Sequence, residues 1–489
     1  MYELLPFRFK RIDNNIILTN ETGEYVYLNS EEFEDLINFK LKPYTKIFDN
    51  LKSRYFICSK QAIDDTIKQL GVKYLTRKSN LLDFTSLHMI VPTLRCNSNC
   101  KYCQVSSKDI NDESYTMDKI TAHKVVESIL QCPASSIKIE FQGGEPLLDY
   151  SIVKYIIEYA ERLNRRIGKQ IDYVICTNLS LIDKSMLNYL KKYNVYISTS
   201  LDGPKLIHDK YRVLRNSKSS YDVFIQKLQL SREILGYENI SALATLTIDS
   251  LLAVTEVIDE YVSLGFNSIF LRMLNPYGRA LKDDNRQYSV QEYIEKYKQA
   301  LDYILGINLN GVFFVEEYTN ILLHKILTPF ASGFVDLQNP SGIGISCALY
   351  NYNGNVYASD EGRMLAEMGD DYFYLGNVLK NSYSEIFDNE HLKIILSKSC
   401  TEILPKCSYC AFLPYCGVDP VRNYLETDNS NKTPENNIFC EKNTKIIEHL
   451  LNLIESNNQD VIDVFWSWVS HKPLERFRHR NENYYWQSN

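Results

Sequence analysis

The chain has 489 residues, of which 45% are hydrophobic and 24% charged, and its formal net charge is −7. This acidic balance argues against a nucleic-acid partner, because nucleic-acid binding proteins usually carry a basic surplus. No apolar run reaches the roughly 18 residues that a membrane span needs, and the start of the chain lacks the apolar core of a signal peptide, so we expect a cytoplasmic protein without a membrane partner.

The length exceeds what one hydrophobic core usually supports, so two or three packed units are expected. Twelve cysteines are present. Because the cytosol keeps thiols reduced, these cysteines are expected to be metal ligands or buried thiols rather than disulfides.

Residues 1–82 predict a small strand-rich domain. Three short apolar runs come first, and the sequence Asn-Glu-Thr-Gly at 20–23 forms a turn between the second and the third. Ser30 is the expected N-cap of a helix that reaches Phe39, and two amphipathic stretches follow. This order is typical of a winged-helix domain. The apolar runs are 7–12, 16–19 and 25–28, and the amphipathic stretches are 47–54 and 61–74.

Residues 87–310 have a different hydrophobic pattern. Six apolar runs alternate with amphipathic segments, which predicts a parallel sheet with right-handed crossovers and, with six such units, a partial (β/α)6 barrel in an α/β fold. Chemistry in such barrels gathers at the carboxyl ends of the strands. The runs are 88–92, 137–141, 173–176, 195–200, 242–247 and 269–273.

The remaining chain divides at about residue 445. Residues 311–445 are irregular and contain six cysteines. A loop-rich segment of this kind buries little core, so it often depends on metal for stability. Residues 446–489 predict a helix at 446–454, followed by an aromatic stretch and a basic, tyrosine-rich tail to which no function is assigned.

A cysteine triplet follows the first predicted barrel strand. Cys96, Cys100 and Cys103 have the spacing CX3CX2C, which suits three corners of an iron–sulfur cube and leaves one iron without a protein ligand. The alternative is a zinc knot or three unrelated thiols. A structural zinc site needs four protein ligands, however, and the next candidates, His123 and Cys132, belong to a predicted helix.

A glycine pair closes the second predicted strand in the sequence Gln142-Gly143-Gly144-Glu145-Pro146. Two glycines permit close backbone approach to a ligand, and a carboxylate can accept hydrogen bonds from an ammonium group. Alone, this sequence could equally be a turn.

Together, these motifs resemble those of the radical S-adenosylmethionine (SAM) superfamily. The resemblance implies that Cys96, Cys100 and Cys103 hold a [4Fe–4S] cluster whose fourth iron binds SAM. It also implies SAM contacts from residues at the ends of the first four strands. For Ser200 and Arg212 the alternatives are a buried polar cap and an ordinary ion pair. The implied contacts are Tyr102, Gln142, Gly143, Gly144, Glu145, Asn178, Ser200 and Arg212.

The C-terminal cysteines resemble the SPASM extension of peptide-modifying radical SAM enzymes. This resemblance implies one auxiliary [4Fe–4S] cluster, with a zinc site as the alternative. The ligands would be Cys407, Cys410, Cys416 and Cys440.

A full SPASM extension holds a second auxiliary cluster. Ser359 and Pro420 stand where two of its cysteines would be, and neither can replace a thiolate on iron. We therefore expect this second cluster to be absent. Cys347 remains, and Cys400 is an extra cysteine without an assigned role.

Asp360 follows the lost cysteine at 359 directly, as a catalytic base does in related sulfatase maturases; the alternative is a solvated turn residue. Three other cysteines lie in predicted strands or helices and are expected to be core thiols. These are Cys58, Cys132 and Cys176.

The N-terminal domain resembles the leader-recognition elements of enzymes that tailor ribosomal peptides, which can bind a precursor's leader as an added strand. The alternative is that it merely packs against the barrel. Short segments at 5–9, 18–24, 276–280 and 416–423 further resemble the radical SAM maturase of the His-Xaa-Ser peptide system. This implies a precursor with His-Xaa-Ser repeats, a second radical SAM maturase as partner, and an electron donor such as flavodoxin or ferredoxin.

Two other functions remain open from the sequence. One is a protein-modifying radical SAM enzyme that resembles an anaerobic sulfatase maturase. The other is a zinc-stabilised binding module without catalysis.

Overall fold

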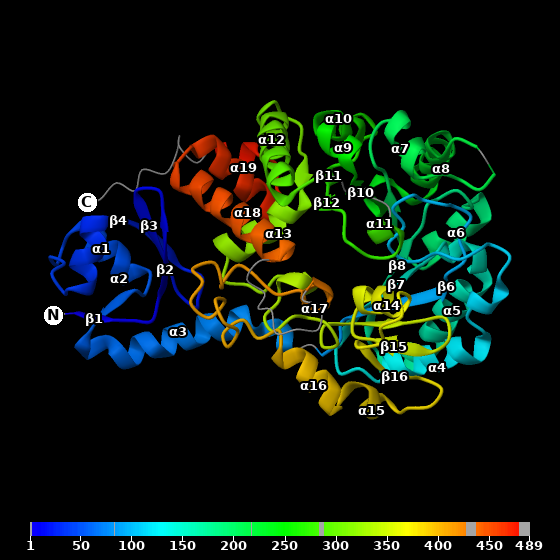
Figure 1. Cartoon of the computed structure of the whole chain (residues 1–489), viewed down its shortest axis with the longest axis horizontal. Coiled ribbons are helices and arrows are strands. Elements are labelled where there is room, and N and C mark those ends of the chain that lie inside the picture. The colour runs from blue at the N-terminus through cyan, green and yellow to red at the C-terminus, as the bar shows by residue number, and fades with distance from the viewer. Residues whose placement is uncertain (1, 83, 217, 283–287, 427–436, 479–489) are drawn as a thin grey trace. The chain divides into compact units, whose positions relative to one another are not determined.

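A computed structural model describes residues 2–82, 84–216, 218–282, 288–426 and 437–478 (Figure 1). The chain forms two compact units. The first contains residues 1–82, 319–342 and 396–489, and the second contains residues 83–318 and 343–395. The segment 311–445, expected as one domain, is thus divided between the units. No helix in the described part of the chain is long and apolar enough to cross a membrane.

The second unit is built on a nine-stranded sheet with the order β12-β10-β9-β8-β7-β6-β14-β15-β16. Its first six strands are parallel and follow one another with helices between them, as the alternating pattern predicts. The strands are β6 (Leu87–Thr93), β7 (Ser136–Gly143), β8 (Gln170–Cys176), β9 (Tyr196–Ser200), β10 (Ile240–Leu246), β12 (Leu271–Met273), β14 (Cys347–Tyr350), β15 (Asn355–Tyr357) and β16 (Tyr374–Asn377). A separate parallel pair joins β11 (Ser268–Ile269) to β13 (Val315–Glu316).

Helices connect these strands and cover the sheet. In β7 the alternate residues Ile137, Ile139 and Phe141 are buried, while Glu140 and Gln142 are only partly buried, so successive side chains face opposite sides. The helices are α4 (Lys119–Leu130), α5 (Tyr150–Ile167), α6 (Lys184–Lys192), α7 (Lys205–Tyr211), α8 (Ser220–Leu235), α9 (Ile248–Leu252), α10 (Val254–Ser263), α11 (Arg279–Lys282), α12 (Val290–Leu309), α14 (Asp360–Ala366) and α15 (Tyr383–Phe387).

Strand β14 explains why residues 343–395 belong to the barrel unit. It pairs parallel with β6, from Cys347 beside Leu87 to Tyr350 beside Ile90, and β15 and β16 then add antiparallel strands. Main-chain pairing with β6 therefore extends the barrel sheet beyond the six predicted strands. Helices α13 (Glu317–Leu327) and α16 (Glu390–Ser397) each span a boundary between the units.

The first unit contains a three-stranded antiparallel sheet in the order β2-β3-β4, close to the three predicted runs. Helix α1 begins after the N-cap Asn29 rather than Ser30, because Asn29 and Glu32 form a reciprocal capping box. A second pair joins β1 to β5. The elements are β1 (Tyr2–Leu4), β2 (Arg8–Ile12), β3 (Asn15–Thr19), β4 (Tyr25–Asn29), α1 (Ser30–Ile37), α2 (Lys46–Ser53), β5 (Ile57–Ser59) and α3 (Ile63–Arg77).

The C-terminal part of the first unit is mostly helical. The helix predicted at 446–454 extends over α18 (Ile438–Glu455), and the aromatic stretch belongs to α19 (Gln459–Ser470). The other helices are α17 (Pro420–Glu426) and α20 (Glu475–Arg478). The end of the predicted tail, from residue 479, lies outside the described residues.

Candidate active site and auxiliary cysteine site

The loop that follows β6 carries three thiols whose charges influence one another. Cys96 is buried, and Cys100 and Cys103 are partly buried. Burial raises the pKa of Cys96, and the neighbouring Glu145, Cys100 and Cys103 raise it further. Burial also raises the pKa of Cys100 to about 11. Binding to a metal cluster would offset the cost of ionising these buried thiols, because metal coordination stabilises the thiolate form.

Two sulfur atoms of this loop have close polar contacts. The amide of Ser98 donates a hydrogen bond to Cys96 Sγ (3.4 Å), and Cys103 Sγ lies 3.4 Å from Ser107 Oγ. Burial alone would raise the pKa of Cys103, but hydrogen bonds from Ser107 and Arg279 outweigh it and lower the pKa below its ordinary value. The loop thus favours a thiolate at Cys103.

The glycine pair lies at the end of β7 against the backbone that leads into the cysteine loop. The amide of Gly144 donates to the carbonyl of Thr93 (2.9 Å). A Cβ on Gly143 would collide with the carbonyl of Thr93, and a Cβ on Gly144 would collide with the carbonyl of Arg95. The glycines therefore permit close approach of β7 to the cysteine loop, whereas the sequence pattern suggested approach to a ligand.

Glu145 ties the end of β7 to the end of β8. Its Oε1 accepts hydrogen bonds from the Thr177 hydroxyl (2.7 Å) and the Leu147 amide (3.1 Å), and its Oε2 accepts one from the Asn178 amide (2.9 Å). Burial raises the pKa of Glu145, and these hydrogen bonds oppose that shift. The carboxylate is thus part of the framework of the site.

Asn178 continues this framework into the cysteine loop. Its Nδ2 donates hydrogen bonds to Asn97 Oδ1 (2.9 Å) and Ser98 Oγ (3.2 Å). Its Oδ1 accepts a hydrogen bond from the Ser180 amide (3.0 Å). Asn178 therefore fixes the turn between Cys96 and Cys100.

Tyr102 and Arg212, two of the expected cofactor contacts, meet at the fully buried Asp202. The Tyr102 hydroxyl donates a hydrogen bond to Asp202, and Arg212 Nε donates to Asp202 Oδ2 (2.9 Å). The Arg212 guanidinium also lies 5.4 Å from the centre of the Tyr102 ring. Ser200 ends β9 two residues before Asp202, with a partly buried side chain.

Arg279 is a residue of this site to which sequence reasoning gave no role. Its amide donates to the carbonyl of Cys103 (2.9 Å), and its guanidinium donates to Asn99 and to Ser107 Oγ (2.7 Å). Gly278 packs so closely that a Cβ there would collide with the carbonyl of Cys103. The sequence contained a hint of this role, because Arg279 lies in the segment 276–280, just after the last predicted barrel strand.

Arg215 also binds the cysteine loop, and no sequence motif pointed to it. Its amide donates to the carbonyl of Asn97 (3.0 Å), and its Nε donates to the carbonyl of Cys96 (3.0 Å). The amide of Asn99 donates to the carbonyl of Val213 (2.7 Å). Residues 213–215 thus line the loop along its backbone.

A polar group lies on the partly buried face of the central strands. Gln142 Nε2 donates to Glu140 Oε1 (2.5 Å), and the Cys176 thiol donates to the same oxygen (3.4 Å). Cys176 pairs with Ser198 across β8 and β9. Burial raises the pKa of Cys176 well above its ordinary value, and Glu140 adds to the shift. Cys58 and Cys132 are buried, as expected of core thiols, whereas Cys176 is partly exposed.

Asp360 begins α14 near this polar group. Asp360 Oδ1 accepts hydrogen bonds from Arg363 Nε (3.4 Å) and Nη2 (3.3 Å), and the fully buried Arg363 also donates to the carbonyl of Val105 (3.1 Å). The Asp360 charge contributes to the raised pKa of Cys176, which places the carboxylate near the end of β8. Helix α14 therefore connects the cysteine loop to the barrel strands.

The four cysteines expected to bind an auxiliary cluster line a single pocket of about 440 Å³ in the first unit. The amide of Phe412 donates a hydrogen bond to Cys410 Sγ (3.4 Å). Burial raises the pKa of Cys416 to about 12, and Cys410 and Cys440 raise it further. The rest of the lining includes apolar side chains such as Leu413 and Val418 together with Thr and Asn residues, and the four-thiol donor set suits a thiolate-bound cluster.

Lys325 contacts this pocket from outside. Its ammonium donates hydrogen bonds to the carbonyls of Leu337 and Cys416, the latter at 3.1 Å. Burial lowers the pKa of Lys325 to about 7. Across the described residues, no three His, Cys, Asp or Glu side chains converge closely enough to share a single metal ion.

The residues at and near the two expected missing ligand positions have structural partners. Ser359 is the N-cap of α14, and its Oγ accepts a hydrogen bond from the Gly362 amide (3.2 Å). Pro420 begins α17. The buried Cys347 lies in β14 and donates to the carbonyl of Ala358 (3.5 Å). Cys400 donates to the carbonyl of Leu396 (3.5 Å) and is not among the residues that line the four-cysteine pocket.

Residues 90–246 match the family model of the Radical SAM superfamily. The radical SAM cyclopropyl synthase TigE of Paramaledivibacter caminithermalis is 26% identical over 361 residues, which are 70% of this chain and 71% of that protein. A cysteine-type anaerobic sulfatase-maturating enzyme of Clostridium novyi is 24% identical over 372 residues, which are 73% of this chain and 93% of that protein.

Two solved structures share the fold. Native anSMEcpe with bound AdoMet has a TM-score of 0.63 at 20% identity and covers 76% of this chain and 99% of its own. Streptococcus suis SuiB, bound to its precursor peptide SuiA, has a TM-score of 0.54 at 16% identity and covers 90% of this chain and 100% of its own. At these identities the likeness concerns the fold.

Proposed function

We propose that this chain, a radical SAM superfamily enzyme, modifies a residue of a ribosomally made precursor peptide. The similarity to radical SAM enzymes favours this function over the non-catalytic zinc-stabilised module. The observation that carries the proposal is the edge strand β2 of the N-terminal sheet. Phe9 on this strand is 49% exposed beside Phe33 of α1, and Arg11 is exposed on the same face. An aromatic and cationic strand edge suits an acidic, partly apolar leader that binds as an added strand.

Radical SAM proteins use a [4Fe–4S] cluster and SAM, and here Cys96, Cys100 and Cys103 would hold the cluster. When bound, the cluster and SAM supply a 5′-deoxyadenosyl radical that abstracts hydrogen from a substrate carbon. Three residues of this chain keep the loop in place for that chemistry. Asn178, Arg215 and Arg279 do so by binding its backbone and side chains.

Glu140 and Gln142 would orient the peptide residue, and Asp360 would receive its proton. These roles are supported by the location of the residues on β7 and near the end of β8, where Asp360 lies near Cys176. Asp360 would be the base, because a carboxylate can accept a proton and Arg363 holds this carboxylate in place.

Cys407, Cys410, Cys416 and Cys440 would bind one auxiliary [4Fe–4S] cluster. A second auxiliary cluster would be absent, because Ser359 and Pro420 stand where two of its thiolate ligands are needed.

The precursor would carry His-Xaa-Ser repeats, a second radical SAM maturase would act with this chain, and a flavodoxin or ferredoxin would supply electrons. These finer assignments rest on the short sequence segments at 5–9, 18–24, 276–280 and 416–423.

The test uses anaerobically reconstituted protein, SAM, dithionite and a purified precursor with His-Xaa-Ser repeats. We expect about eight irons per chain, 5′-deoxyadenosine, and a peptide mass change by mass spectrometry. A Cys96, Cys100, Cys103 triple-alanine variant should keep about four irons and produce no 5′-deoxyadenosine. SAM cleavage by that variant, or zinc in place of iron, would contradict the proposal.

A sulfatase-maturase-like activity is the second candidate, favoured by the match to 93% of the Clostridium novyi enzyme. A cysteine-containing sulfatase peptide in the same assay distinguishes the two substrates, because each candidate predicts a mass change in only one peptide.

A further inference from the structure

Strand β2 has two faces that serve different neighbours within the first unit. Because successive side chains alternate along a strand, Phe9 and Arg11 face α1 while Arg8 and Lys10 face the opposite side. Arg8 Nε donates a hydrogen bond to the carbonyl of Ser408 (2.6 Å), and the Lys10 ammonium lies 4.8 Å from the centre of the Phe412 ring. The strand that would receive a peptide therefore also contacts, through side chains on one face, the auxiliary cysteine segment, defined here as residues 407–416.

The rest of the N-terminal domain binds the same segment. Thr19 Oγ1 on β3 donates to the carbonyl of Ala411 (2.6 Å). The Tyr415 hydroxyl donates to the carbonyl of Gly23 (3.0 Å), in the turn between β3 and β4. With Arg8 and Ser408, these contacts anchor the backbone both between Cys407 and Cys410 and between Cys410 and Cys416.

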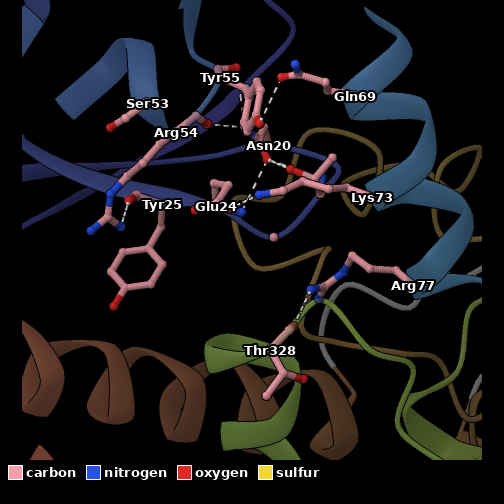
Figure 2. Close-up of polar contacts among 12 residues, drawn as sticks. Asn20, Glu24, Tyr25, Ser53, Arg54, Tyr55, Gln69, Lys73, Arg77 and Thr328 are labelled. Atoms are coloured by element: carbon pink, nitrogen blue, oxygen red, sulfur yellow. Dashed lines mark hydrogen bonds and ion pairs between the residues drawn. The ribbon is translucent and has the colours of Figure 1, made fainter. Parts of the chain in front are cut away.

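Arg77 adds a contact from the end of α3. Its guanidinium donates to the carbonyls of Thr328 (3.2 Å), Lys325 (2.9 Å) and Pro414 (2.8 Å). Figure 2 shows Arg77 reaching from its helix toward Thr328. Within the described residues, no carboxylate forms an ion pair with Arg77 or Lys325. A thiolate-bound cluster in the adjoining pocket would supply the missing negative charge.

The auxiliary cysteine segment receives part of its hydrogen bonding from the N-terminal domain. Residues 400–416 contain only turns and bends, with no helix or strand. Backbone amides in turns satisfy several carbonyls of this segment, and side chains of the N-terminal domain donate to three others, those of Ser408, Ala411 and Pro414. These contacts link the backbone around the cysteines to the N-terminal domain.

We propose that the N-terminal domain is the scaffold of the auxiliary centre, so that peptide binding on β2 and metal binding by the four cysteines strengthen each other. Arg8 and Arg77 are positioning residues in this coupling. The scaffold role stands on the contacts alone, whereas the link to a peptide rests on the proposed function. Coupling between two binding sites is reciprocal, so each ligand must change the other's affinity by the same factor.

The first arm of the test measures metal without peptide. Arg77→Gln removes the charge and most of the carbonyl contacts. Arg54→Gln is the matched control, because Arg54 Nη1 donates to the carbonyl of Tyr25 (2.7 Å) inside the N-terminal domain (Figure 2). After anaerobic reconstitution, we expect Arg77→Gln to fall from about eight irons toward about four and to keep the EPR signal of the first cluster. Arg54→Gln should keep about eight.

A milder variant guards against general misfolding. Tyr415→Phe removes only the hydroxyl that donates to Gly23, and it should release auxiliary iron to a chelator faster than the parent protein. Unchanged iron content and release rates in both Arg77→Gln and Tyr415→Phe would overturn the scaffold role.

The second arm adds the His-Xaa-Ser precursor with its leader. We expect the peptide to tighten the binding of auxiliary iron by about 5- to 150-fold in equilibrium competition with a chelator, and a Cys410→Ala variant to bind the peptide more weakly by a similar factor. Tight peptide binding that is equal in both proteins would overturn the coupling and leave the proposed function intact. Absence of any peptide binding would refute the proposed function, and the first arm would still decide the scaffold role.

Discussion

The backbone amide of Arg279 donates a hydrogen bond to the carbonyl of Cys103, 2.9 Å away. The same arginine binds Asn99 and Ser107 through its guanidinium, on either side of that cysteine in the chain. Arg279, which follows the last parallel strand, thus holds the second half of the cysteine loop in place.

Replacing Arg279 by Gln should weaken that loop. Hydrogen bonds that involve a charged group contribute about 1.5–3 kcal/mol each, so we expect faster loss of iron from the first cluster and slower formation of 5′-deoxyadenosine. EPR and chelation kinetics measure the first effect, and chromatography measures the second. Arg166→Gln, at an exposed position in the last turn of α5, is the control. Wild-type iron retention in Arg279→Gln would show that the backbone hydrogen bond from residue 279 to Cys103 is enough to hold the loop, without the guanidinium.

A methyl group at Gly144 should disrupt the packing of β7 on the cysteine loop. The new Cβ would collide with the carbonyls of Leu94 and Arg95. Overpacking of this kind costs about 1–3 kcal/mol, so Gly144→Ala should lower the thermal midpoint and the iron content. Gly306→Ala in α12 meets no atom within 4 Å and should stabilise the helix by about 0.5–1 kcal/mol. Equal midpoints for the two variants would contradict this account.

Asp360→Asn should abolish peptide modification without abolishing SAM cleavage. The amide cannot accept the substrate proton, so the ratio of modified peptide to 5′-deoxyadenosine should fall. The substitution also removes the carboxylate partner of the buried Arg363, and breaking such a pair costs about 3–5 kcal/mol. Thermal unfolding must therefore be measured in parallel. If Asp360→Asn makes wild-type amounts of product, Asp360 is not the base.

The buried His88 should make the protein sensitive to acid. Burial lowers its pKa to about 3 in the folded chain, whereas an unfolded histidine has a pKa of about 6.5. Between these values the unfolded chain binds the extra proton, so stability is complete above about pH 6.5 and falls as pH drops, by at most about 1.4 kcal/mol per pH unit.

His88→Gln should reduce this slope in denaturant titrations of the metal-free protein between pH 7 and about pH 4. His471→Asn, at an exposed position, controls for the loss of one imidazole. A slope in His88→Gln as steep as in the parent protein would mean that other groups account for the acid sensitivity.

Cys347→Ser should leave the iron content unchanged if only one auxiliary cluster is present. The Cys347 side chain is buried in β14 and donates to the carbonyl of Ala358, and serine preserves a donor at that place. Iron analysis should give about eight irons in both proteins. A loss of several irons would reveal a second auxiliary cluster despite Ser359 and Pro420.

The sequence alone determined the strand-and-helix order of the barrel and the residues that cluster there. Alternating apolar runs predicted the six parallel strands, because periodicity and strand length are local properties of the chain. The cysteine spacing and the glycine pair identified the loop that carries Cys96, Cys100 and Cys103, because a short motif places its functional side chains within a few residues of one another.

Tertiary structure alone decided which distant segments share a site. Arg215 and Arg279 reach the cysteine loop from more than 100 positions along the chain. Residues 343–395 join the barrel sheet, and residues 1–82 join the C-terminal cysteines in one unit. These arrangements depend on main-chain pairing and on hydrogen bonds between separate segments, and such contacts leave no periodic trace in a single sequence. Arg77 illustrates what sequence cannot predict, because only the fold reveals that its guanidinium donates to three carbonyls rather than to a carboxylate.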